Sequence, residues 1–207
     1  MSKKKKDIRD ELISLVPSTT QRVLDVGCAG GKLSCKLKDK NITIIGIEKN
    51  KKLYNEAKNR LDEVILGDAE KINLSYPNDY FDCILYADIL DCFVNPAAVL
   101  KKHITHLNEG GYVVASMANI RYYKTVRDLV FCGRWDYKEG GILWKEHLRF
   151  FTLANIKELF EGAGCQIIEI KRNIVSSRIM KILNFLLFNR LKNFLVYQYY
   201  IKAQKRR

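Results

Sequence analysis

The sequence predicts one doubly wound α/β domain, in which helices cover both faces of a parallel sheet. Short β-branched runs alternate with helical stretches along most of the chain, a pattern typical of strands joined by right-handed helical crossovers. A glycine cluster directly follows the first of these runs, where such folds bind ligands. The 207 residues are 47% hydrophobic, which supplies apolar surface for one sizeable core and excludes wholesale disorder.

The first half of the chain repeats the strand and helix pattern. Apolar residues recur at helical spacing from Ile8 to Val16 and predict a short amphipathic helix that ends at Pro17. Arg22 to Gly27 is expected to form the first strand, and Lys32 to Lys38 the helix after it. The pattern continues with strands expected at 41–47, 63–66 and 80–86 and a helix at 51–60.

The second half completes a set of seven strands. Pro96 stands in the first turn of a helix that is predicted to reach Leu107 and to end at Gly110-Gly111. Thr152 is a candidate N-cap for another helix. That helix is expected at 153–161, and the remaining strands at 112–116, 165–170 and 197–204.

Two segments interrupt this rhythm within a single domain of residues 1–207. The segment 118–150 is aromatic and basic, and it lies where folds of this class place their substrate walls. The stretch from Val175 to Phe194 is an apolar and basic helical candidate. The expected parts are a basic N-terminal segment and helix (1–19), a cofactor-binding half (20–117), a substrate-side insertion (118–150) and a basic amphipathic helical insertion (174–195).

Positive charge is concentrated at the two ends of the chain. The formal net charge of +13 reflects 36 Lys and Arg against 23 Asp and Glu, yet residues 11–169 hold 21 of each sign. Residues 170–207 hold ten basic and no acidic side chains. The neutral body argues against nucleic acid as a partner, whereas segment 174–195 suits a peripheral contact with an anionic membrane. A cap over the site or a homodimer contact is the alternative role for that segment.

The cysteine pattern predicts free thiols in a reducing compartment. The six cysteines show no paired C-x-x-C spacing, so neither a disulfide framework nor a zinc site is expected. The lysine-rich start is followed by no apolar run, and no stretch approaches the roughly 20 apolar residues that span a bilayer. We therefore expect a cytoplasmic protein, with a peripheral membrane contact on the inner face as the open alternative.

The turn after the first strand excludes two kinds of phosphate site. Gly27, Gly30 and Gly31 let a ligand approach the backbone at the start of a helix. A Walker A loop needs four residues between its glycines and then Lys-Ser or Lys-Thr, and a dinucleotide fingerprint needs glycine where Ala29 and Lys32 stand. Neither phosphate motif fits this turn.

An acidic residue follows each of the next two strands. Glu48 can bind both hydroxyls of a ribose, because a carboxylate offers two acceptor oxygens. Asp68 is placed to accept from an adenine amino group while the Ala69 amide meets a ring nitrogen, and Asp25 is placed to orient an ammonium group. A ligand with amine, carboxylate, ribose and adenine but no phosphate satisfies this set. S-adenosylmethionine is such a ligand.

Five motifs in order resemble those of the class I S-adenosylmethionine-dependent methyltransferases: VLDVGCAGG, GIEKN, GDAE, FDCILYADILDCFVNP and LNEGGYVVAS. The resemblance covers roughly residues 20–172. It implies a Rossmann-like seven-stranded sheet, mostly parallel with an antiparallel last strand, and helices on both faces. The aromatic segment further resembles a bacterial and archaeal branch associated with sugar and cell-envelope biosynthesis.

The resemblance also implies roles for individual residues. Asp88 is implied to lie beside the transferring methyl group, and it is also a candidate catalytic residue. The implied cofactor-binding residues are Asp25, Gly27, Cys28, Ala29, Gly30, Gly31, Glu48, Lys49, Asp68, Ala69 and Asp88. The chain departs from many relatives at Asp91-Cys92, where they carry Glu-His, and at Ala118, where proline is common.

The insertion supplies the candidates for catalysis and acceptor binding. His147 is the candidate general base, because an unperturbed imidazole of pKa ~6.5 accepts protons near neutral pH. A hydrogen-bonded histidine that pins the insertion to the sheet is the alternative. Four further side chains are expected to form an aromatic and cationic wall for the acceptor: Arg121, Tyr122, Trp135 and Arg149.

The predicted function is O-methylation of a small-molecule or saccharide-type acceptor by in-line displacement, with S-adenosylhomocysteine as product. The fourth strand ends in Ala87-Asp-Ile-Leu90 and not in an Asn-Pro-Pro-Tyr type of motif, which favours an oxygen over an amino acceptor by elimination. Two alternatives remain open. One is an RNA methyltransferase that uses the basic ends, and the other is a regulatory subunit that binds the cofactor and transfers nothing.

Overall fold

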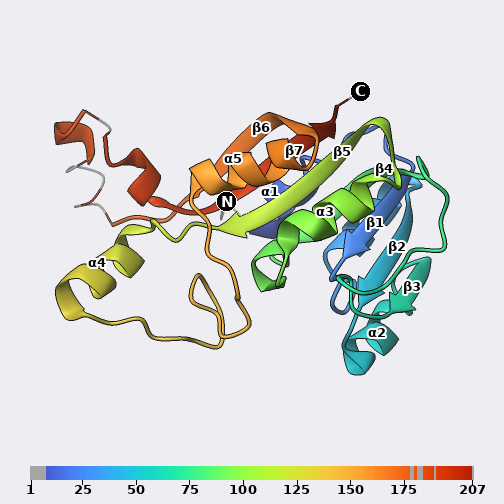
Figure 1. The fold of residues 1–207 in the computed structure, drawn as a ribbon, viewed down its shortest axis with the longest axis horizontal. Coiled ribbons are helices and arrows are strands. Elements are labelled where there is room, and N and C mark those ends of the chain that lie inside the picture. The colour runs from blue at the N-terminus through green and yellow to red at the C-terminus, as the bar shows by residue number, and fades with distance from the viewer. Residues whose placement is uncertain (1–7, 178–179, 181–183, 189, 207) are drawn as a thin grey trace, which may run out of the picture.

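The computed structural model (Figure 1) describes the chain except residues 1–7, 178–179, 181–183, 189 and 207. The lysine cluster of the predicted basic start therefore lies outside the described residues. Seven strands form one sheet in the order β3-β2-β1-β4-β5-β7-β6. Their bounds are β1 Arg22–Val26, β2 Thr43–Glu48, β3 Glu63–Leu66, β4 Phe81–Ala87, β5 Leu107–Ala118, β6 Cys165–Ile174 and β7 Val196–Lys205.

The sheet has the predicted mixture of strand directions. Strands β1 to β5 run parallel to one another, and β7 inserts antiparallel between β5 and β6. The order reverses at β1 and β4, because the chain moves outward to β3 and then returns to the far side of β1. Ligands of open α/β sheets bind in the crevice at such a switch point. The Rossmann-like, doubly wound fold predicted from the sequence is confirmed.

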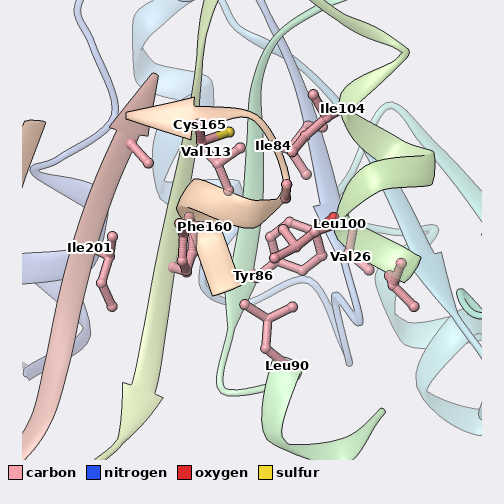
Figure 2. Packing of buried hydrophobic residues seen from close by; sticks show 14 of the residues in the cluster. Val26, Ile84, Tyr86, Leu90, Leu100, Ile104, Val113, Phe160, Cys165 and Ile201 are labelled. Atoms are coloured by element: carbon pink, nitrogen blue, oxygen red, sulfur yellow. The ribbon is translucent and has the colours of Figure 1, made fainter. Parts of the chain in front are cut away.

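Helices cover both faces of the sheet, and each face has its own core. On one face, Tyr86 and Ile84 of β4 meet Leu100 and Phe160 from helices α3 and α5 (Figure 2). On the other face, Leu85 of β4 lies in the cluster that holds residues of α1, η1 and α2. Adjacent residues of β4 thus point to opposite cores. The helices are α1 Ile8–Ile13, η1 Ser34–Lys40, α2 Lys51–Ala57, η2 Leu90–Cys92, α3 Pro96–Ile104, α4 Tyr123–Cys132, α5 Leu153–Gly162 and η3 Lys192–Phe194.

Side chains at element ends stabilise the helices, as predicted for Thr152 and Pro96. Asn50 caps α2 by accepting from the Lys52 and Leu53 amides. Thr152 caps α5 in a capping box with Asn155. Pro96 occupies the first turn of α3.

Three elements differ from their predictions. The helix after β1 is a 3₁₀ helix, and it ends where Asn41 adopts a left-handed conformation. Gly110 and Gly111 do not end α3; they lie inside β5, where Gly110 has φ +70° and the register with β4 shifts between Phe81 and Cys83. A glycine followed by a β-rich run occurs both at helix ends and at irregular strand starts, so this pattern does not distinguish the two.

The predicted helix from Val175 to Phe194 is the third difference. The described residues 175–177 are irregular, 180 and 184–186 are helical and 192–194 form η3, while six other positions of the segment lie outside the described residues. The Val175 amide donates to the Leu195 carbonyl at 3.1 Å, which closes the segment into an excursion between β6 and β7. Within the described residues, no helix is both long and apolar enough to cross a membrane.

Candidate functional site

The turn between β1 and η1 has backbone conformations that few side chains tolerate. Gly27 and Gly31 both have φ +71°, and Ala29 also lies in the left-handed region at φ +48°. A Cβ atom at Gly27 would stand 2.7 Å from Cγ1 of Ile89, so only glycine fits there. The Gly27 amide donates to the Ile47 carbonyl at 2.9 Å, which ties the turn to β2. At its glycines the turn therefore presents bare backbone to a ligand above it.

Glu48 at the end of β2 is held rigidly beside this turn. Its Oε2 accepts from the Ala29 amide at 2.9 Å and its Oε1 from the Asn50 amide at 2.7 Å. The side chain is buried, yet it lines a cavity. Each carboxylate oxygen has a second lone pair, so both oxygens can still accept from a ligand. The geometry suits a pair of neighbouring hydroxyl groups.

Asp25 on β1 is a buried carboxylate with unused acceptor capacity. Only 2% of the residue is exposed, and Oδ1 accepts no hydrogen bond from the described residues. Burial raises the pKa of Asp25 to about 6; the Glu48 charge adds to the increase, and the Ser34 hydroxyl partly opposes it. A cationic ligand group placed here would restore the charged form.

A cavity of about 850 Å³ brings these groups together, and we call it the glycine-turn cavity. A smaller hollow of about 190 Å³ lies beside it and shares Gly27, Glu48 and Ile89 with it. Of the predicted cofactor residues, the larger cavity is lined by Asp25, Gly27, Cys28, Ala29, Gly30, Glu48, Lys49 and Asp88. The hollow adds Asp68 and Ala69. Gly31 lines neither space, because its turn packs on Leu61 from behind.

Asp88 follows β4 with φ +56° and lies at the centre of a polar cluster. Its Oδ1 accepts from the Ser116 hydroxyl at 2.6 Å and from the side-chain amide of Gln198. Its own amide donates to Ser116 Oγ at 3.0 Å. Strands β4, β5 and β7 thus each contribute one residue to the same edge of the cavity.

His147 does not reach the cavity wall. Its neighbours Trp144, Glu146 and Leu148 line the glycine-turn cavity, but the imidazole is buried, and Nδ1 lies 3.0 Å from the Ile142 carbonyl. The Trp144 ring packs edge-on against it, with centroids 5.5 Å apart. These contacts hold the imidazole within the insertion itself and away from the lining of the glycine-turn cavity.

The predicted acceptor wall does not form as one surface. The Arg149 guanidinium donates twice to the Val94 carbonyl, at 3.0 and 2.6 Å. Trp135 packs edge-on against Phe150, and Arg121 lies 4.6 Å above the centre of the Phe194 ring. Tyr122 alone of the four lines a cavity, and that cavity is a different one. Three of the four predicted side chains, those of Arg121, Trp135 and Arg149, therefore contact other parts of the protein.

Two further polar residues, Asp82 and His103, hold elements together. Asp82 accepts from the Gln21 and Arg22 amides at 2.9 and 2.8 Å and from Asn108 at 2.6 Å, so it joins the start of β1 to that of β5. His103 is fully buried and lies 2.9 Å from the Tyr86 hydroxyl. Burial lowers the pKa of His103 to about 4, with the neighbouring Lys102 contributing, so the imidazole is neutral.

Burial disfavours the thiolate form of Cys92, a free cysteine beside the site. Cys92 lines both spaces, but burial raises its pKa to about 12, with help from the Asp91 charge. Burial also raises the pKa of the neighbouring Asp91 to about 7. Its carbonyl accepts from the Leu148 and Arg149 amides, both at 2.9 Å, which anchors the end of the insertion. Among the described residues, no cluster of three His, Cys, Asp or Glu side chains is arranged to hold a metal ion.

Sequence reasoning missed Ser116 and Gln198. Both lie in strands that the sequence predicts, but the sequence analysis did not predict which strands are neighbours in the sheet. Asp88 is 28 residues from Ser116 and 110 from Gln198. No local motif links positions that far apart, so only the strand order reveals the cluster.

Comparisons with known proteins agree with this geometry. Residues 2–170 match a family model described as a methyltransferase domain. The ubiquinone biosynthesis O-methyltransferase of Aeromonas salmonicida is 26% identical over 149 residues, 70% of this chain and 62% of that protein. An uncharacterized methyltransferase of Anoxybacillus flavithermus is 30% identical over 105 residues, 50% of each chain. This chain thus spans less than two thirds of the length of these curated relatives.

The fold is shared with a solved structure. The crystal structure of a SAM-dependent methyltransferase from Archaeoglobus fulgidus matches with a TM-score of 0.72 at 17% sequence identity. The match covers 96% of this chain and 93% of the archaeal chain. At this sequence identity, the similarity shows only that the two chains share a fold.

Proposed function

This chain belongs to the methyltransferase domain family, and on that premise we propose that it methylates an oxygen of a small-molecule or saccharide-type acceptor with S-adenosylmethionine as methyl donor. The family and the fold indicate this cofactor. The observation that carries the proposal is the glycine turn flanked by two buried carboxylates, Asp25 and Glu48. A phosphate ligand would be repelled by this pair, whereas a nucleoside with an ammonium group fits it.

The residues present fit S-adenosylmethionine. The free Oδ1 of Asp25 suits the amino group, and the remaining lone pairs of Glu48 suit the ribose hydroxyls. Asp68 and Ala69 in the adjoining hollow suit the adenine. S-adenosylmethionine supplies a methyl carbon bonded to a positively charged sulfur, and transfer of that methyl group leaves S-adenosylhomocysteine.

The protein's contribution to the reaction is chiefly alignment and exclusion of water. Asp88 stands at the edge where β4, β5 and β7 meet, and Ser116 and Gln198 fix its carboxylate. Residues of the insertion, including Trp144 and Leu148, wall the same cavity. Positioning of two reactants can supply ~7–11 kcal/mol, whereas a general base typically adds ~100-fold to 10,000-fold.

An oxygen acceptor is supported by two independent points. The end of β4 reads Ala87-Asp-Ile-Leu90, which differs from the motifs of amino-group methylation. The curated relative from Aeromonas salmonicida is named an O-methyltransferase. The sugar and cell-envelope branch rests on the aromatic insertion motif alone.

The decisive experiment has two stages. Titration calorimetry with S-adenosylhomocysteine first tests the cavity, and binding is expected for the wild-type chain. Incubation with methyl-labelled S-adenosylmethionine and cell extract then shows where the label goes. Label in small molecules or saccharides supports the proposal; label in RNA favours the RNA methyltransferase, and tight binding with no label favours a regulatory subunit.

We also propose that segment 174–195 touches an anionic membrane surface from the cytoplasmic side. Phe185 and Phe188 are 75% and 89% exposed, and Arg190 and Lys192 follow them closely. Helix α4 adds Phe131, which is 83% exposed. Both regions project beyond the same end of the sheet, opposite β3 (Figure 1). Exposed aromatic side chains with basic neighbours suit an interface with acidic lipids.

A further inference from the structure

A second cavity lies beyond the glycine-turn cavity. It has a volume of about 660 Å³ and is enclosed by α4, the loop 134–143 and the adjoining ends of β6 and β7. Of the described residues, Gln198 alone belongs to the linings of both this cavity and the glycine-turn cavity. The two spaces therefore meet at the residue that holds Asp88. A volume of this size suits a small molecule.

The wall of this second cavity carries an excess of positive charge. Among the described residues, four basic side chains line it against two carboxylates. Arg127 pairs with Asp128 at 2.6 Å and Arg134 with Asp136 at 2.9 Å. Neither Lys124 nor Lys138 forms an ion pair with the described carboxylates. We call the space the lysine cavity.

The inner end of the lysine cavity is aromatic. Tyr122 is buried and meets Tyr197 edge-on, with ring centroids 5.3 Å apart. Gly141 lies against the Tyr197 hydroxyl, where an added Cβ atom would stand 2.9 Å from the oxygen, and its φ is +85°. The loop can approach the tyrosine only with glycine at this position. Tyr197 precedes Gln198, so the aromatic surface leads directly to the junction of the cavities.

We propose that the lysine cavity is the acceptor site and that the acceptor carries an oxyanion, a carboxylate or a phosphate, bound by Lys124 and Lys138. The oxygen to be methylated then reaches the glycine-turn cavity beside Gln198. This inference rests on the proposed function, which leaves the acceptor's charge and location open. It replaces the predicted wall of Arg121, Trp135 and Arg149, whose side chains are engaged elsewhere.

Binding of anions can be tested without catalysis, because Cys132 lines the lysine cavity and its residue is exposed. Its reaction with the dianionic dithiobis(nitrobenzoate) is compared with that of neutral dithiodipyridine, by mass spectrometry of the modified peptide. The ratio of the two rates cancels any change in the thiolate fraction. We expect this ratio to fall by about tenfold at low salt in Lys124→Ala/Lys138→Ala. It should stay constant in Lys101→Ala/Lys157→Ala, which removes two exposed lysines outside the cavity.

The second arm examines the acceptor itself. Label transferred from the cofactor should enter small molecules that an anion exchanger retains, and phosphatase treatment distinguishes a phosphate from a carboxylate. The double alanine variant should need about tenfold more extract for half-maximal labelling, while its binding of S-adenosylhomocysteine stays unchanged. Lys124→Arg/Lys138→Arg keeps both charges and should label at the wild-type amount of extract. An uncharged labelled product, or an unchanged rate ratio at Cys132, overturns the inference. If S-adenosylhomocysteine does not bind the wild type, the proposed function fails instead, and the Cys132 arm still decides on the anion site.

Discussion

The side-chain amide of Gln198 donates a hydrogen bond to the Asp88 carboxylate, across 110 residues of sequence. The bond joins the antiparallel strand β7 to the end of β4, and Ser116 of β5 adds a second donor at 2.6 Å. Gln198 also separates the glycine-turn cavity from the lysine cavity. The Gln198 amide and the Ser116 hydroxyl thus fix the orientation of the carboxylate at the point where the two reactants are proposed to meet.

Replacement of Gln198 by leucine should lower the free energy of unfolding by about 1.5–3 kcal/mol, because a hydrogen bond to a charged group is lost. Gln204→Leu is the matched control on the same strand, since Gln204 donates to the neutral Gly110 carbonyl at 2.8 Å. The Gln204→Leu substitution should lower the free energy of unfolding by only about 0.5–1.5 kcal/mol. Urea denaturation measures both values. Equal costs for the two variants would show that the Asp88 bond has no special strength.

Glu48→Gln should weaken S-adenosylhomocysteine binding by about 10-fold to 100-fold. Both carboxylate oxygens accept hydrogen bonds from backbone amides. In the glutamine variant an NH₂ group replaces one of these oxygens and faces an N–H donor, so the side chain is displaced. Glu56→Gln is the control, because Glu56 lines the same cavity and pairs with Arg60 at 3.8 Å. Calorimetry reports both affinities. Wild-type affinity in Glu48→Gln would remove this residue from the nucleoside site.

Affinity for S-adenosylhomocysteine should rise with pH between pH 5 and 7 and then level off. The pKa of Asp25 is raised to about 6, so at pH 5 only about a tenth of the protein carries the charged form that an ammonium group requires. Binding there should be about tenfold weaker than at the plateau. Asp25→Asn should bind weakly at every pH and lose this dependence. A flat profile in the wild type would contradict the assignment of Asp25 to the amino group.

His147→Ala should reduce stability more than turnover. The side chain is buried against Trp144 and bonded to the Ile142 carbonyl, and it lies outside the cavity lining. Loss of that bond should cost about 1–3 kcal/mol in urea denaturation. His106→Ala, which removes a half-buried histidine 3.2 Å from the Pro77 carbonyl, is the control. A fall in kcat of about 100-fold or more in folded His147→Ala would restore the general-base role.

The parts of the site that the sequence predicts share one physical property. Gly27, Glu48 and Asp68 each follow a strand of a parallel sheet, and parallel strands bring their carboxyl ends to one edge. Their proximity follows from the strand and helix pattern alone. The same pattern identifies Asp25, whereas Asp88 is implied by the family resemblance.

The parts that were missed depend on tertiary geometry. Gln198 reaches Asp88 only because β7 inserts antiparallel between β5 and β6, and local sequence does not determine strand order. Arg149 was predicted to line the acceptor wall because its side chain is cationic, but its guanidinium donates hydrogen bonds to the Val94 carbonyl. Arginine in an aromatic insertion has the same sequence signal whether it binds a ligand or a loop.

Binding to vesicles that contain acidic lipids should depend on the aromatic residues of segment 174–195. Phe185 and Phe188 are largely exposed, and burial of one large apolar side chain contributes about 1.5–3 kcal/mol. Phe185→Ser/Phe188→Ser should therefore reduce vesicle sedimentation at least tenfold. Leu66→Ser on the distant edge strand β3, where Leu66 is 45% exposed, is the matched apolar control.

The charge contribution of this segment can be separated from its apolar contribution. Arg190→Glu/Lys192→Glu should abolish the preference for acidic over neutral vesicles, because each basic residue near an anionic surface contributes about 1 kcal/mol. Added salt should have the same effect on the wild type, since screening acts on the charges alone. Lys101→Glu on α3 should change little. If the wild type binds neither vesicle but sediments as a dimer in analytical ultracentrifugation, the exposed aromatic residues form a contact between two copies of the chain instead.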